Sequence, residues 1–197
     1  MINKAEVINF FDAQAQTWDE EMLRNDEVIS IILDNAGVCA GAHVLDVACG
    51  TGVLFPDYLS RSVASLTGID ISPEMAKRAA EKFPDERVEV LCCDIESASF
   101  DRLFDVVMVY NAFPHFPDPE NLIRTLASLT KPGGRLSIAH GMSRAAIDRH
   151  HTGSAHHVSN GLMSEQELKK LFEPFFSVDT VISDERMYQV AGTKTAP

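Results

Sequence analysis

One segment decides the fold of this chain: Val44-Leu45-Asp46-Val47-Ala48-Cys49-Gly50-Thr51-Gly52. It is a short apolar run that leads into a glycine-rich turn. An apolar run of this length is typical of a strand that is buried on both faces. Glycine lets the backbone adopt a positive φ and approach a ligand closely. Residues 53–61 continue with helical spacing, so the segment predicts a strand, a ligand-binding turn and a helix.

The same alternation of apolar runs and helical patterns continues along the chain. We expect further strands over residues 64–69, 88–92, 104–109, 135–140, 175–183 and 185–193. We expect helices over residues 72–83, 119–129 and 164–172. Ser72 and Ser164 would be N-caps, and Lys131-Pro132-Gly133-Gly134 would end the second helix. Strands separated by helices predict a doubly wound, Rossmann-like α/β fold with helices on both faces of a sheet.

Before this alternation, residues 3–36 carry apolar side chains at helical spacing, and Gly37 is a plausible helix C-cap. We expect residues 1–36 to form a helical cover. The chain has 197 residues and contains no internal repeat or linker. A single domain over residues 1–197 is therefore the expected organisation.

The composition excludes several classes of partner. The chain carries 17 Lys and Arg against 29 Asp and Glu, which gives a net charge of −12. This balance disfavours nucleic acid and anionic membrane surfaces. No apolar segment approaches the roughly 20 residues that span a bilayer, and the first residues do not resemble a secretory signal. Cys39, Cys49, Cys92 and Cys93 form no C-x-x-C pair. We interpret them as reduced, mostly buried thiols of a cytoplasmic protein.

Three carboxylates follow successive predicted strands: Asp46, Asp70 and Asp94. Each alone is more typical of a solvated loop than of a binding site. Together they would meet at the carboxyl edge of the sheet, where a buried carboxylate is costly unless it binds something. Asp70 lies about 20 residues after Gly50, a separation at which an acid meets ribose hydroxyls. Asp94 can accept a hydrogen bond from an adenine amine. The set indicates a bound adenosine that carries a positive group.

The glycine turn also weighs against a dinucleotide. The pattern G-x-G-x-x-G requires a third glycine for close packing of the helix on the strand. Counted from Gly50, that position is Phe55. A nicotinamide-dependent oxidoreductase is therefore the disfavoured alternative.

The chain resembles the class I S-adenosylmethionine-dependent methyltransferases between about residues 42 and 140. The resemblance is carried by the quoted segment followed by Gly68-Ile69-Asp70-Ile71-Ser72, Cys93-Asp94-Ile95, Phe104-Asp105-Val106-Val107 and Leu129-Thr130-Lys131-Pro132-Gly133-Gly134-Arg135-Leu136. The earlier pattern Phe10-Phe11-Asp12…Ala15…Trp18-Asp19 resembles the small-molecule branch that includes quinone-ring methyltransferases, the methyltransferase type 11 branch. Ala48 departs from the family, in which glycine is commonest at that position.

This resemblance implies a seven-stranded sheet of order 3-2-1-4-5-7-6 with an antiparallel strand 7. It also implies that the chain binds S-adenosylmethionine and releases S-adenosylhomocysteine, with a small molecule as methyl acceptor. The implied cofactor residues are Asp46, Ala48, Cys49, Gly50, Thr51 and Gly52 near the methionine moiety, Asp70 at the ribose, Ile71, Asp94 and Ile95 at the adenine, and Asn111 near the methyl group. Trp18 either packs over the cofactor or lies in the core.

The resemblance places the acceptor pocket after the fourth strand, where Tyr110 and Phe113 are candidate acceptor residues. His115 has two phenylalanines and two prolines as neighbours, and is either a general base or acceptor anchor, or a structural histidine. His140 ends the fifth strand and is a second catalytic candidate. A base is needed only if the acceptor must lose a proton.

Histidines cluster in one segment: five of the seven lie between residues 140 and 157. In the family, the corresponding region varies with substrate, so we expect residues 141–163 to form a variable substrate loop in which His151 and His156 contact the acceptor. A metal site formed by His150, His151, His156 and His157 is an alternative, although their six-residue intervals fit neither a helical pair nor a zinc finger. A polar surface loop is the third reading. A non-catalytic module that senses S-adenosylmethionine or a metal is the alternative function.

Overall fold

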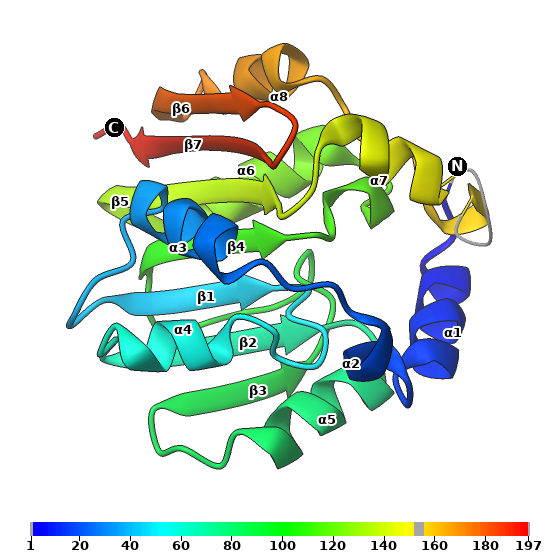
Figure 1. Ribbon diagram of the computed structural model, residues 1–197. Helices are drawn as coiled ribbons and strands as arrows, with labels where there is room; N and C mark the ends of the chain where they lie inside the picture. The colour runs from blue at the N-terminus through cyan, green and yellow to red at the C-terminus, as the bar shows by residue number, and fades with distance from the viewer. Residues whose placement is uncertain (1, 152–155, 197) are drawn as a thin grey trace.

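The computed structural model describes residues 2–151 and 156–196, and within them a single seven-stranded sheet has the order β3-β2-β1-β4-β5-β7-β6 (Figure 1). Strand β7 is antiparallel to both of its neighbours, and the other pairs are parallel. The predicted strand order and direction are therefore confirmed. The strands are β1 (His43–Val47), β2 (Ser65–Asp70), β3 (Val88–Cys92), β4 (Phe104–Tyr110), β5 (Thr130–His140), β6 (Phe176–Ser183) and β7 (Tyr188–Lys194).

The helices alternate with the strands as the sequence predicts. They are α1 (Lys4–Gln14), α2 (Trp18–Glu21), α3 (Asp26–Asn35), α4 (Phe55–Ser60), α5 (Pro73–Lys82), α6 (Pro119–Leu129), α7 (Arg144–His151) and α8 (Glu165–Phe172), with short 3₁₀ turns η1 (Phe113–His115) and η2 (His156–Val158). The predicted N-caps are confirmed. The Ser72 hydroxyl accepts from the amide of Met75, and Ser164 forms a capping box with Glu167. Gly37 follows α3 with a φ of 74°.

Two hydrophobic layers cover the sheet. Helices α3, α4 and α5 pack on one face, and α6, α7 and α8 pack on the other. In β1, Val44 contributes to the first layer and Leu45 to the second, because successive side chains of a strand point to opposite faces. Helices α1 and α2 lie instead at the edge toward which the parallel strands point (Figure 1). That edge is the predicted ligand-binding edge.

The turn between β1 and α4 uses three left-handed residues. Gly50 and Gly52 have φ values of 56° and 82°, and Ala48 has a φ of 56°. Glycine adopts this conformation without strain, whereas alanine does not. The structure thus explains why the family favours glycine at the position of Ala48. Close packing of α4 on the sheet comes from Gly68 of β2, because a Cβ there would lie 2.5 Å from Cζ of Phe55.

Three boundaries differ from the prediction by two residues or more. Strand β7 begins at Tyr188 rather than at residue 185. Helix α4 begins at Phe55 rather than at residue 53, because residues 51–54 form turns. Strand β5 begins at Thr130 rather than at residue 135, so Lys131-Pro132-Gly133-Gly134 lies in an irregular first part of the strand. The pairing of β4 with β5 shifts register there, and Gly133 has a φ of 77°. Here the proline and the two glycines lie at an irregularity within strand β5 and not in a loop before it.

Two further expectations need correction. Residues 141–163 are not a loop throughout, because they contain α7 and η2. The cysteines are free thiols, but Cys49 alone of the four is buried. Cys39 is exposed in the loop after α3, and Cys92 is exposed because β3 is an edge strand. The apolar sequence around Cys92 does not reveal that its strand lies at an exposed edge of the sheet.

Candidate active site

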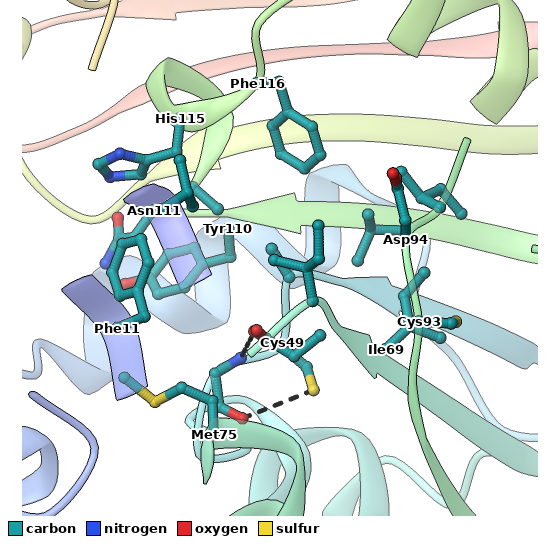
Figure 2. Close-up of a pocket in the computed structure, with 18 of the residues that line it drawn as sticks. Phe11, Cys49, Ile69, Met75, Cys93, Asp94, Tyr110, Asn111, His115 and Phe116 are labelled. Carbon is teal, nitrogen blue, oxygen red and sulfur yellow. Dashed lines mark hydrogen bonds between the residues drawn. The ribbon is translucent and has the colours of Figure 1, made fainter. Parts of the chain in front are cut away.

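A pocket opens at the carboxyl ends of β1, β2, β3 and β4, beneath α1 and α2 (Figure 2). It encloses about 1050 Å³ when the space at its open mouth is counted. Figure 2 shows Phe11, Asn111 and His115 at one end of this pocket and Asp94 and Cys93 at the other. The predicted residues that line it are Trp18, Ala48, Cys49, Gly50, Asp70, Ile71, Asp94, Ile95, Tyr110, Asn111 and His115.

Gly50 forms a bare section of the pocket wall. Apart from the two chain neighbours of Gly50, only Nε1 of Trp18 lies within 4 Å of the position that a Cβ of Gly50 would take, at 3.9 Å. The indole of Trp18 therefore faces the open space beside the Gly50 backbone, which a larger side chain at position 50 would fill. Such a cradle allows a ligand to approach the main chain.

Asp70 is the buried carboxylate of the pocket. Its side chain accepts from the amides of Gly50 and Ser72, both at 2.8 Å. Burial raises its pKa to about 6, although the backbone hydrogen bonds act to lower it. Each oxygen accepts one of these amides and keeps a further lone pair, so the carboxylate can also accept from a diol.

Asp46 lies behind the glycine turn and does not line the pocket. Burial raises its pKa to about 8, and the charge of Asp70 adds to this effect. The hydroxyl of Tyr58 acts to lower this pKa, but its geometry falls short of a hydrogen bond. The predicted contact of Asp46 with the cofactor stays a prediction.

Ile71 and Ile95 provide apolar walls near Asp94. Oδ1 of Asp94 accepts from the amide of Glu96 at 3.1 Å, and Oδ2 pairs with Nζ of Lys4 at 2.5 Å. This end thus combines apolar surface for a ring with a carboxylate acceptor. Its pairing with Lys4 was not predicted.

His115 lies at the opposite end of the pocket (Figure 2). Its Nδ1 is 2.7 Å from the carbonyl oxygen of Val158. A carbonyl only accepts, so Nδ1 carries the hydrogen and the basic lone pair of the neutral ring is on Nε2. The ring also meets the ring of Phe11 edge-on, with centroids 5.0 Å apart. The hydrogen bond to Val158 thus sets the tautomer of the neutral ring.

Asn111 begins the loop after β4. Its φ is 55°, which asparagine tolerates better than most residues, and its side chain accepts from the amide of Gly141 at 3.0 Å. The side chain thereby joins the loops after β4 and β5. Tyr110 is 7% exposed beside it, and burial raises the pKa of its hydroxyl.

Other predicted residues lie away from this pocket. Thr51 and Gly52 do not line it, and Phe113 is buried in the core beside it. His140 is buried in β5, where its ring packs against Tyr188 with centroids 6.0 Å apart. The structure thus does not bring His140 to the pocket wall. The predicted roles of these residues stay predictions.

The histidine segment is only partly described. The side chains of His150, His151 and His156 lie outside the described residues, so their predicted roles stay predictions. His157 is exposed, and its ring lies 5.9 Å from that of Phe10. Among residues 2–151 and 156–196, no group of three or more histidine, cysteine or acidic side chains is arranged to hold a metal ion.

Several pocket residues were not predicted, and they come mainly from the N-terminal helices and from loop neighbours of predicted residues. They include Lys4, Val7, Phe11, Met22, Val53, Met75, Cys93, Glu96 and Phe116. The pattern from Phe10 to Asp19 was the available signal for Phe11. Lys4 had no local signal, because it is 90 residues from its partner Asp94.

A seven-stranded sheet of this order, with its pocket beyond the carboxyl ends of the strands, defines the Rossmann-like methyltransferase fold. The N-methyltransferase NodS from Bradyrhizobium japonicum, solved with S-adenosylhomocysteine, has a TM-score of 0.74 and 17% identity over 98% of this chain and 100% of its own. Magnesium protoporphyrin IX methyltransferase from Synechocystis PCC 6803, solved with S-adenosylmethionine, has a TM-score of 0.71 and 17% identity over 99% and 98%.

The sequence agrees with the fold. Residues 45–138 match the family described as Methyltransferase domain. The ubiquinone biosynthesis O-methyltransferase of Coxiella burnetii is 32% identical over 144 residues, which cover 68% of this chain and 61% of that protein. This chain therefore belongs to the class I S-adenosylmethionine-dependent methyltransferases, and it spans less than two thirds of the length of this relative. Within the described residues, no helix is both long and apolar enough to cross a bilayer.

Proposed function

We propose that the chain transfers a methyl group from S-adenosylmethionine to a small-molecule acceptor. The observation that carries this proposal is the layout of one pocket. Gly50 provides bare backbone, Asp70 provides a buried acceptor for a diol, and Asp94 lies beside the apolar walls of Ile71 and Ile95. These features suit a methionine moiety, a ribose and an adenine in that order. When bound, this cofactor supplies an electrophilic methyl group on a sulfonium.

The end of the pocket around His115 supports an acceptor with an apolar, planar body. Trp18 and Phe11 meet edge-on with centroids 5.6 Å apart, and Phe11 meets His115 in the same way. Aromatic rings favour such contacts with one another and with flat ligands. The similarity to ubiquinone biosynthesis O-methyltransferases supports a hydroxyl as the methylated group.

His115 would accept the proton that such a hydroxyl loses. Its Nδ1–H is held by the carbonyl of Val158, which leaves Nε2 as the basic atom of the ring. The surrounding residues position the acceptor for in-line displacement and exclude water from it. A thiol that is already ionised would not require this base.

The test measures transfer of a labelled methyl group from S-adenosylmethionine to catechols and hydroquinones. We expect turnover with at least one phenolic acceptor. We expect His115→Asn to lower kcat by about 100-fold or more, since general bases contribute at least this factor, while the affinity for S-adenosylhomocysteine is unchanged. Full activity in the variant would overturn the assignment of the base. Strong cofactor binding without transfer to any acceptor would favour a sensing module instead.

We also propose a cytoplasmic location. All four cysteines are free thiols, as a reducing compartment maintains them.

The net charge of −12 supports a small molecule as the methyl acceptor rather than nucleic acid.

A further inference from the structure

Helices α1 and α2, residues 4–21, form a cover that we call the roof. Val7, Phe11 and Trp18 of the roof line the pocket. Val7 is the one buried residue of α1, and it belongs to a small cluster with Ile2 and Val158. The buried apolar contact of α1 is thus small, and polar contacts add to the attachment of the roof.

The first polar contact reaches the loop after β3. Nζ of Lys4 pairs with Oδ2 of Asp94 at 2.5 Å and also with Oε2 of Glu96. Glu96 is held from the other side by the amide group of Asn121 at 2.8 Å. The two carboxylates raise the pKa of Lys4 although burial opposes this effect, so the ammonium stays charged.

The second polar contact reaches the loop after β2. Oδ1 of Asp12 accepts from the hydroxyl of Ser72 at 2.5 Å and from the amide of Glu74 at 3.2 Å. Ser72 is the N-cap of α5, so the carboxylate also lies at the positive end of that helix.

The third polar contact reaches the loop after β1. Oδ1 of Asp19 accepts from the hydroxyl of Thr51 at 2.5 Å, and Oδ2 pairs with Nζ of Lys82 at 2.6 Å. These partners lower the pKa of Asp19 although burial opposes the shift. The roof is thus attached once to each of three successive loops that form the pocket.

We infer that Lys4, Asp12 and Asp19 are positioning residues that hold the roof closed over the cofactor pocket and set the rate at which it opens for exchange. This inference also explains the pattern from Phe10 to Asp19. Phe11 and Trp18 of this pattern line the pocket, and its two aspartates attach the roof. Because the ion pairs are partly exposed, each makes a small contribution that salt weakens.

The first experiment needs no cofactor. Trp18 is the single tryptophan of the chain, so its fluorescence reports on the roof. We expect acrylamide to quench this fluorescence at least about twofold more strongly in a Lys4→Met, Asp12→Ala, Asp19→Ala triple variant. We expect added salt to increase quenching in the wild type and to have little effect in the variant. Equal quenching in the two proteins would overturn the inference.

Controls separate opening of the roof from unfolding. Circular dichroism first tests whether the triple variant is folded. If the triple variant is unfolded, quenching is measured in each of the three single variants, and unchanged quenching in all three overturns the inference. Arg186→Met removes the ion pair of Arg186 with Glu27, which does not involve the roof, and should leave quenching unchanged. Combining Asp19→Lys with Lys82→Asp exchanges the two charges and should reverse part of the increase in quenching seen in Asp19→Lys alone.

The second experiment rests on the proposed function. Release of S-adenosylhomocysteine, followed by stopped flow, should be about fivefold or more faster in the triple variant. Unchanged release together with stronger quenching would show that the roof opens without controlling exchange, and would overturn that part of the inference. If wild-type protein does not bind the compound, the proposed function fails, whereas the quenching result still decides whether the roof is held as we infer.

Discussion

Asp46 and Asp70 are buried carboxyl groups that lie close to each other at the strand ends. Burial raises the pKa of Asp46 to about 8 and that of Asp70 to about 6, from an ordinary value of 3.8. The folded chain therefore keeps protons that the unfolded chain loses above about pH 4. As the pH rises from about 4 to 8, the free energy of unfolding should fall, and it should level off above that range. A ligand that donates hydrogen bonds to Asp70 would offset part of this cost.

This argument predicts the effect of Asp46→Asn. The variant removes an ionisable group that is costly to charge, so its free energy of unfolding should exceed that of the wild type more at pH 8 than at pH 5. The two gains should differ by at least about 1 kcal/mol. Urea unfolding at both pH values measures this difference. Asp101→Asn is the matched control, because the side chain of Asp101 is 90% exposed. An equal gain at both pH values would contradict the argument.

At the scale of elements, α4 packs closely on the sheet through a glycine in strand β2, not through a glycine in the turn after β1. A dinucleotide fold brings its helix close to the strand through a third glycine in the turn. Here that position is Phe55, whose ring lies over Gly68 in β2. The ring also packs against Phe83 after α5, with centroids 5.2 Å apart. Helix α4 thus approaches the sheet closely because the bulky Phe55 of the helix faces a glycine, Gly68, in the strand.

Gly68→Ala tests this packing. The added Cβ would lie 2.5 Å from Cζ of Phe55 and 3.1 Å from Sγ of Cys49. We expect a loss of about 1–3 kcal/mol in the free energy of unfolding, as is usual for overpacked cores. Combining Gly68→Ala with Phe55→Leu should lose less than the sum of the two single changes. Strictly additive losses in chemical denaturation would show that the two residues do not compete for space.

Elements with a local signal could be predicted from the sequence, and those that depend on distant partners could not. The glycine turn, Asp70 and the N-cap Ser72 are encoded within a few residues, and the structure has the turn and the cap as predicted. Helix α7 was missed because its histidine-rich sequence lacks a strong apolar stripe. Lys4 was missed because its ion pair exists only once β3 and α1 have been brought together.

At the scale of the whole molecule, one pocket lies between the sheet edge and the roof. The sheet supplies Gly50, Asp70 and Asp94 at the ends of parallel strands, and the roof supplies Phe11 and Trp18 above them. Neither part alone encloses a ligand. The central claim is that S-adenosylmethionine occupies this pocket with its ribose on Asp70.

Calorimetric titration of the full chain with S-adenosylhomocysteine tests that claim most directly. We predict saturable binding to the wild type. We predict weaker binding to Asp70→Ala by about 1–3 kcal/mol, because hydrogen bonds to a charged group are lost. NADH should give no saturable heat. Binding of NADH in place of S-adenosylhomocysteine, or an unchanged affinity in Asp70→Ala, would contradict the account.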